Sequence, residues 1–223
     1  MSLEKAHGGI HSFHSPRHIM KQRILLIAMA IMSVLGMASC SEDDGTVEEY
    51  PNWKVQNETF FNNLSDSVSA LIKADPSRND WKRIKSWTKA EDYTGTNEDY
   101  IIVKVVEQGP ATETNTPIYT DTVAVHYAGS LLPSTSYKQG LLFDSSFDEP
   151  FDEQTSVVST MRISATVEGF ATALQNMHRG DHWIVYIPYQ LGYGTVDKSV
   201  IPAYSTLVFD IRMKDFWRTK SSE

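Results

Sequence analysis

An alternation of apolar side chains with a period of two residues, repeated in three short segments, restricts the folds open to this chain more than any other feature. The alternating residues are Val123, Val125 and Tyr127, then Trp183, Val185 and Ile187, and finally Leu207, Phe209, Ile211 and Met213. This period is typical of β-strands that bury one face. The β-branched run from Asp99 to Glu107 ends before Gly109-Pro110 and predicts a further strand.

A helical period occurs once within this β-rich region. Phe170, Leu174 and Met177 have the i, i+4, i+7 spacing of one helix face, and we expect Gly180 to cap the C-terminus of that helix. Five to six strands with a single short helix predict an α+β fold, in which an antiparallel sheet wraps on the helix.

A longer amphipathic helix is predicted over residues 52–74. The apolar side chains that fall on one face of it are Trp53, Phe60, Phe61, Leu64, Val68, Leu71 and Ile72. We expect Asn52 to cap its start and Asp75-Pro76 to end it. The next stretch, residues 81–98, fits either a strand or a helical turn that packs its tryptophans beside the helix. Residues 52–98 would together form an N-terminal helical extension.

The first 39 residues have the pattern of a secretory signal. Basic residues from Arg17 to Arg23 precede the apolar run Ile24 to Ala38, which is shorter than a membrane-spanning helix requires. Met20 is an alternative start. Cys40, the only cysteine, follows Gly36-Met37-Ala38-Ser39, which resembles the lipobox of bacterial lipoproteins. We expect Cys40 to be lipidated, and a plain secretory signal stays open as the alternative.

Charge argues against nucleic acid as a partner. The chain has a formal net charge of −8, and removal of residues 1–39 takes away four Lys/Arg and one Asp/Glu, which leaves 16 basic and 27 acidic residues, or −11. Phosphate backbones require a basic surface. The acidic residues that follow Cys40 indicate a solvated tether over residues 40–51.

Most enzyme chemistries lack the residues that they need. His126, His178 and His182 are the only histidines after residue 19, and they do not have the spacing of a metal-binding motif. The sequence contains no glycine-rich phosphate loop. We therefore expect no metal and no cofactor.

Five short motifs resemble, in order and spacing, the FKBP family of peptidyl-prolyl cis-trans isomerases. The motifs are V-H-Y-A-G (125–129), F-D-S-S (143–146), V-E-G-F (167–170), L-G-Y-G (191–194) and I-P-A-Y-S-T-L-V-F-D (201–210). The resemblance implies an isomerase domain over residues 99–217, followed by a polar tail at 218–223. It also implies that helix 52–74 either packs on this domain or forms a homodimer.

The resemblance assigns roles to eight residues. The implied catalytic residues are Tyr127, Asp144 and Tyr193. The implied substrate-binding residues are Phe143, Val167, Phe170, Ile201 and Phe209. Within this set Asp144 would lie near the substrate amide carbonyl, Tyr193 would donate a hydrogen bond to a substrate carbonyl, and Val167 would bind through its backbone N–H.

The chain departs from the family pattern around the pocket. Phe170 replaces the usual tryptophan of the floor, Val157 and Ser159 replace a pair of aromatic residues, and Ile201-Pro202-Ala203-Tyr204 replaces I-P-P-H in the flap over the pocket. Ser130 to Leu142 forms a longer loop. These departures leave two alternatives to an isomerase: a non-catalytic binding or chaperone module, and a scaffold that dimerises through residues 52–74.

The expected partners and location follow from these readings. We expect proline-containing polypeptides as substrates and a membrane contact through the lipid on Cys40. The expected location is the bacterial cell envelope, with the protein anchored to the outer membrane on its periplasmic or its outer side.

Overall fold

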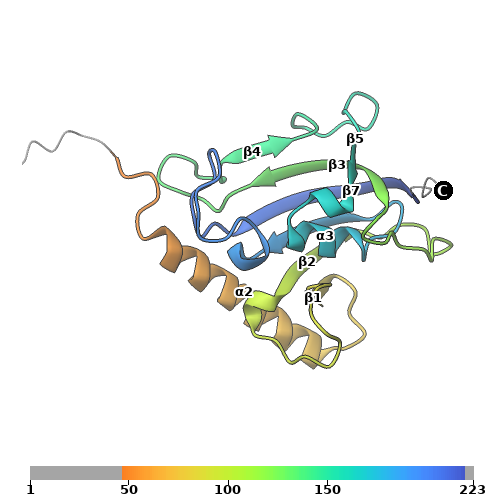
Figure 1. Ribbon diagram of the computed structural model, residues 1–223, viewed down its shortest axis with the longest axis horizontal. Helices are drawn as coiled ribbons and strands as arrows, with labels where there is room; N and C mark the ends of the chain where they lie inside the picture. The colour runs from red at the N-terminus through yellow and green to blue at the C-terminus, as the bar shows by residue number, and fades with distance from the viewer. Residues whose placement is uncertain (1–46, 219–223) are drawn as a thin grey trace, which may run out of the picture. The chain divides into compact units, whose positions relative to one another are not determined.

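A computed structural model describes residues 47–218, so the predicted signal, Cys40 and the acidic residues next to it lie outside the described residues. The described part contains a seven-stranded antiparallel sheet, one strand more than the upper expectation (Figure 1). The sheet order is β1-β2-β6-β7-β3-β4, and β5 pairs with β3. The strands are β1 (Trp81–Lys85), β2 (Tyr100–Glu107), β3 (Thr122–Ser130), β4 (Leu142–Ser145), β5 (Ser159–Arg162), β6 (His182–Ile187) and β7 (Leu207–Trp217). The α-helices are α2 (Trp53–Ala74) and α3 (Glu168–Leu174). The predicted α+β class is confirmed.

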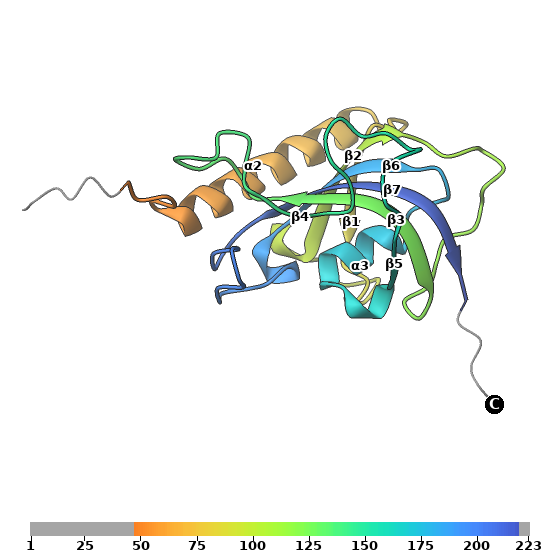
Figure 2. The same ribbon diagram turned by 90° about the horizontal axis from the view of Figure 1, so that it is seen from above.

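The two helices lie on opposite faces of the sheet, as Figure 2 shows. The short helix α3 covers the inner face, where the alternating residues of β3, β6 and β7 form the main core. Trp183, Val185 and Ile187 are all at most 1% exposed. Each large apolar side chain buried in this way contributes about 1.5 to 3 kcal/mol. The alternation in the sequence therefore predicted the buried face correctly.

Helix α2 covers the outer face at one edge of the sheet. Phe61 and Val68 are buried there against Ile102 of β2, with Trp81 and Tyr186 partly buried around them. The apolar stripe of residues 52–74 is therefore mostly covered by the sheet of the same chain. Phe60 and Leu71 are the stripe residues that stay largely exposed, at 38% and 40%.

The start of α2 differs from the expectation. Asn52 precedes the helix, but its backbone is left-handed (φ 51°) and its side chain makes no capping hydrogen bond. Asparagine tolerates this left-handed conformation better than most residues do. The helix ends at Ala74, directly before Asp75-Pro76, as predicted.

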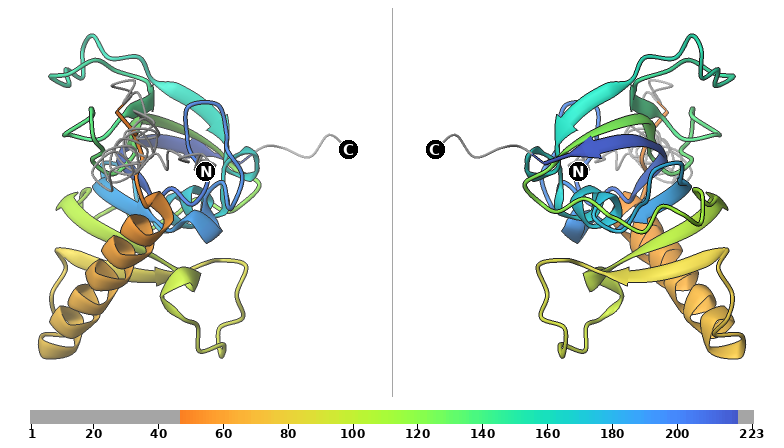
Figure 3. Two further views of the ribbon diagram at one scale, coloured as in Figure 1. Left: turned by 90° about the vertical axis from the view of Figure 1, so that its left-hand side faces the viewer. Right: turned by 90° about the vertical axis from the view of Figure 1, so that its right-hand side faces the viewer.

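The stretch 81–98, for which the sequence left two options open, begins with a strand. β1 pairs antiparallel with β2 and forms one edge of the sheet, and β4 forms the other edge (Figure 3). Trp81 stacks on Tyr186 and lies beside α2 as expected. Trp87 does not lie there, because it stacks on Tyr119 with ring centroids 4.2 Å apart.

Gly180 does not cap helix α3, so that prediction was wrong. The helix ends at Leu174 with Gln175 as its C-cap. Met177 lies in the loop that follows the helix, and its side chain is buried. Gly180 has a φ of 85° and lies in the turn before β6, where its N–H donates to the carbonyl of Met213 at 2.8 Å. A glycine is favoured at position 180 because the turn before β6 requires a positive φ there, and not because the helix ends there.

Candidate active site

An open pocket of about 450 Å³ lies where the inner face of the sheet meets the start of α3. Its lining residues are Tyr127, Asp144, Met161, Ala165, Thr166, Val167, Phe170, Tyr193, Lys198 and Phe209. They come from β3, β4, β5, β7, α3 and the loops beside them. Six of the eight residues predicted for the site are thus brought together.

Aromatic rings form the floor of the pocket. Phe170 and Phe209 are 4% and 5% exposed, and their ring centroids are 4.7 Å apart in an edge-to-face arrangement. The ring of Tyr127 lies 6.1 Å from that of Phe170. Such edge-to-face contacts stabilise aromatic clusters and fix the ring orientations. The floor is therefore a rigid apolar surface.

Gly129 allows two of these rings to approach the sheet closely. A Cβ atom at this position would lie 2.6 Å from ring atoms of both Phe143 and Phe209. These two rings meet edge to face at 5.6 Å directly behind the pocket. The glycine of V-H-Y-A-G thus has a packing role.

One polar pair stands on the pocket wall. The Tyr127 hydroxyl donates to Oδ2 of Asp144 at 2.7 Å. The pairing of β3 with β4 brings the two side chains together, because Gly129 is opposite Asp144 in the register. Burial, followed by the adjacent Asp144 carboxylate, raises the pKa of Tyr127 well above its ordinary value. The phenol therefore stays protonated and holds the carboxylate in place.

Tyr193 and Val167 lie on other sides of the pocket. Burial, followed by the charge of Asp144, raises the pKa of Tyr193. Its hydroxyl makes no hydrogen bond to any residue in the range 47–218. Val167 occupies the position just before α3. A hydrogen-bond donor and the start of the helix thus border an apolar floor.

Phe143 and Ile201 do not line the pocket. Phe143 packs behind the floor against Phe209, and Ile201, 5% exposed, belongs to the main core. The resemblance did not distinguish side chains that face the pocket from those that support it. Val157 is 68% exposed and Ser159 begins β5, so neither supplies an aromatic wall.

Four lining residues were not predicted: Met161, Ala165, Thr166 and Lys198. Met161 could have been found, because it alternates with Ile163 in a segment that is otherwise polar, and β5 pairs it with Val123. Lys198 carries no such signal, since it reaches the pocket from an irregular loop.

Residues 47–218 contain neither a candidate metal site nor a candidate membrane span. No group of three or more His, Cys, Asp or Glu side chains there could hold a metal ion. None of the helices in this range is both long and apolar enough to span a membrane.

Fold and site together define a class of protein, an α+β domain with an apolar pocket between its antiparallel sheet and one short helix. The profile of the family described as FKBP-type peptidyl-prolyl cis-trans isomerase matches residues 113–214. Residues 113–214 of this chain belong to that family.

Curated proteins with similar sequences include one whose name states the same activity. "Macrophage infectivity potentiator" of Trypanosoma cruzi is 35% identical over 111 residues, 48% of this chain and 50% of that protein. "FKBP-type peptidyl-prolyl cis-trans isomerase FkpA" of Escherichia coli (strain K12) is 28% identical over 162 residues, 71% of this chain and 54% of that protein. "Outer membrane protein MIP" of Legionella longbeachae is 32% identical over 113 residues, 49% of this chain and 41% of that protein. The chain therefore spans about half the length of the curated relatives it matches.

Proposed function

We propose that the chain is a peptidyl-prolyl cis-trans isomerase that assists the folding of exported proteins. The observation that carries this proposal is the apolar floor of Phe170 and Phe209 with the Tyr127–Asp144 pair at its wall. Rotation about an X-Pro bond breaks no covalent bond, but it faces a barrier of about 18 to 20 kcal/mol because the C–N bond is partly double. A catalyst of this step needs to favour the twisted amide over the planar one.

An apolar pocket supplies this preference. The planar amide has the larger charge separation, so it loses more than the twisted amide when water is removed. In the proposed complex the proline ring lies on Phe170 and Phe209. Tyr193 donates to a substrate carbonyl, the N–H of Val167 binds the substrate backbone, and Asp144 lies near the amide carbonyl. Phe143 and Ile201 support the floor from behind.

The test is the cis-to-trans relaxation of an X-Pro peptide with the purified protein. We expect kcat/KM to fall about tenfold in Tyr193→Phe, since one hydrogen bond to the substrate is lost. Asp144→Ala should also lower kcat/KM, because Tyr127 then loses the acceptor that orients it. Tyr137→Phe is the matched control, because Tyr137 is exposed and outside the pocket. Absence of acceleration, or variants as active as the control, would refute the mechanism.

A non-catalytic binding or chaperone module is the second candidate. The exposed Val196 and Val200, 65% and 55% exposed, favour it, because they present apolar surface close to Lys198 of the pocket. This function predicts that Tyr193→Phe still suppresses aggregation of an unfolded client as well as the unchanged protein does. If Tyr193→Phe loses both the isomerase activity and the ability to suppress aggregation of the client, a non-catalytic binding module is excluded.

A lipid anchor at Cys40 is the proposed attachment to the outer membrane. The support comes from the sequence pattern around Cys40 and from the name of the Legionella longbeachae relative. Metabolic labelling with a fatty-acid analogue should mark the protein, and Cys40→Ser should abolish the label. A labelled Cys40→Ser protein would contradict the anchor.

A homodimer through residues 52–74 stays a prediction. A second copy would meet Phe60 and Leu71, the exposed stripe residues of α2, since the rest of the stripe is covered. Sedimentation analysis should then give a dimer that Leu71→Lys dissociates, and a monomer at all concentrations would refute the interface.

A further inference from the structure

Two residues of the pocket belong to one irregular segment, residues 193–204, which we call the pocket loop. It carries Tyr193 at its start and Lys198 near its tip. The backbone N–H of Tyr204 closes the loop by donating to the carbonyl of Gly194 at 3.0 Å. Lys198 and Ile201 exchange two backbone hydrogen bonds inside it, at 2.8 and 2.9 Å. The position of Tyr193 in the pocket therefore depends on how the base of this loop is held.

The base of the pocket loop is in an unfavourable backbone conformation. Tyr204 has a φ of 64°, which is uncommon for a residue with a large side chain. Such residues persist only where the surrounding structure fixes them. Contacts that hold Tyr204 and the residues after it are thus required for the loop to keep its shape.

Helix α2 provides these contacts from its first turn and a half. The indole Nε1 of Trp53 donates to Oγ of Ser205 at 2.8 Å, and this hydrogen bond is buried. Oδ1 of Asn57, which is fully buried, accepts from the backbone N–H of Thr206 at 2.7 Å. Ser205 in turn donates to the carbonyl of Pro202 within the loop. Two residues of α2 therefore fix the chain directly after Tyr204.

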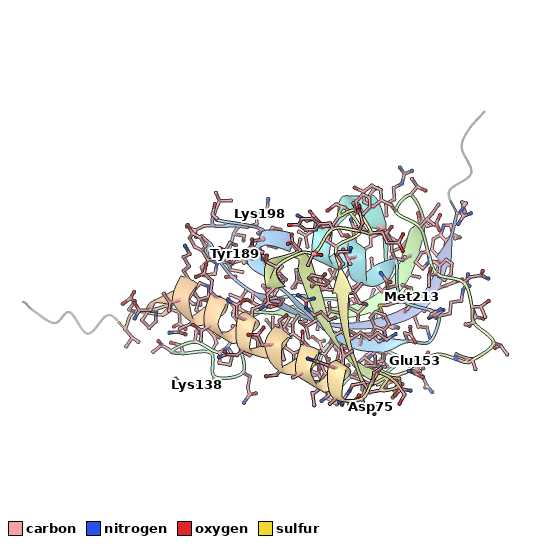
Figure 4. All side chains as sticks on the ribbon, turned by 90° about the horizontal axis from the view of Figure 1, so that it is seen from below. Asp75, Lys138, Glu153, Tyr189, Lys198 and Met213 are labelled. Carbon is pink, nitrogen blue, oxygen red and sulfur yellow. The ribbon has the colours of Figure 1, made fainter. Side chains whose placement is uncertain are left out.

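The ring of Tyr204 is held from the same side. Nζ of Lys54 lies 4.9 Å from its centroid, and the ring of Tyr189 meets it edge to face at 5.1 Å. The hydroxyl of Tyr189 donates to Glu58 of α2 at 3.0 Å. Figure 4 shows Tyr189 beside the first turns of α2. The contact thus extends over the first two turns of the helix.

We propose that the start of α2 positions the pocket loop, so that Trp53 and Asn57 are positioning residues for the isomerase site although they do not line it. The inference rests on the proposed function for its effect on activity. The path runs from Trp53 through Ser205 and Tyr204 to Gly194 and so to Tyr193. The N-terminal helix is then a working part of the site and not only a cover for the sheet.

The test compares Trp53→Phe with Trp81→Phe in the purified protein. Trp53→Phe keeps an aromatic ring but removes the donor to Ser205. Trp81→Phe makes the same change where α2 packs on the outer face, against Tyr186. We expect Trp53→Phe to lower kcat/KM for an X-Pro peptide about threefold to tenfold and to speed amide hydrogen exchange at Tyr204. Trp81→Phe should change neither.

Ser205→Ala leaves the helix intact but removes the same hydrogen bond from the loop side, together with the one that Ser205 donates to the Pro202 carbonyl. Its effect should be at least as large as that of Trp53→Phe, and the double variant should be no worse than Ser205→Ala alone, because the Trp53–Ser205 hydrogen bond is already absent there. Unchanged exchange at Tyr204 in both variants would overturn the inference whether or not the protein is an isomerase. If exchange at Tyr204 is faster in the variants but the unchanged protein has no isomerase activity, the positioning of the pocket loop by α2 holds and the proposed function is refuted. If the unchanged protein is an active isomerase and Trp53→Phe has the same kcat/KM, the role of Trp53 in catalysis is overturned.

Discussion

Tyr127 shows how a single residue of the pocket couples its chemistry to the stability of the fold. Its phenol is partly buried and donates to Asp144, so the folded state binds this proton more tightly than the unfolded state does. A pKa that is raised on folding gives a contribution that is fully present below the unfolded pKa, about 10 for tyrosine, and is lost as the pH rises beyond it.

Alkaline unfolding tests this residue directly. We expect the free energy of unfolding to fall as the pH rises above about 10, and Tyr127→Phe to remove part of that fall. Part will remain, since burial and then Glu58 also raise the pKa of Tyr189, to about 12. Urea unfolding at several pH values between about 8 and 11 measures the slope. An identical pH dependence in Tyr127→Phe would show that its proton is not held by folding.

Helix α2 is the element whose role the structure defines most clearly. Phe60 and Phe61 are neighbours in the sequence, but Phe61 is 3% exposed in the cluster with Ile102, and Phe60 is 38% exposed. If α2 is part of the folded domain, Phe61→Ala should destabilise the protein by about 3 to 5 kcal/mol. Phe60→Ala, the matched control, should change stability by about 0.5 kcal/mol or less. Urea unfolding of the two variants, followed as a single transition, measures both free energies. Equal small losses of stability in Phe61→Ala and Phe60→Ala would mean that α2 is only loosely attached to the sheet.

Elements with a clear hydrophobic period could be predicted from the sequence, and elements fixed by distant partners could not. β6 and β7 alternate over six or more residues, so their buried faces were correct. β4 and β5 are only four residues long and have no clear apolar alternation, and they exist because β3 supplies their hydrogen bonds. β1 was ambiguous because its residues Lys82 to Lys85 are mostly charged and pair with β2 only in three dimensions.

At the scale of the whole molecule, the motifs predicted part of the pocket lining, and loops contribute the rest. Tyr127, Phe170 and Phe209 belong to regular elements, and the structure brings them together at one pocket. Lys198 comes from the pocket loop, whose shape depends on contacts with α2 between residues about 150 positions apart in the sequence. No local pattern contains that contact. The resemblance therefore predicted the fold and the floor of the pocket. The pocket loop is determined by tertiary contacts between segments that are distant in the sequence.

The central claim is that this pocket lowers the barrier to X-Pro rotation and does not merely bind one isomer. Uncatalysed exchange takes tens to hundreds of seconds, so the cis and trans signals of a proline peptide show no exchange cross-peaks at mixing times of about one second. Exchange spectroscopy by NMR with a catalytic amount of the protein should produce these cross-peaks while the cis and trans populations stay the same. Absence of cross-peaks, or a shift in populations in proportion to added protein, would contradict catalysis and indicate a binding module.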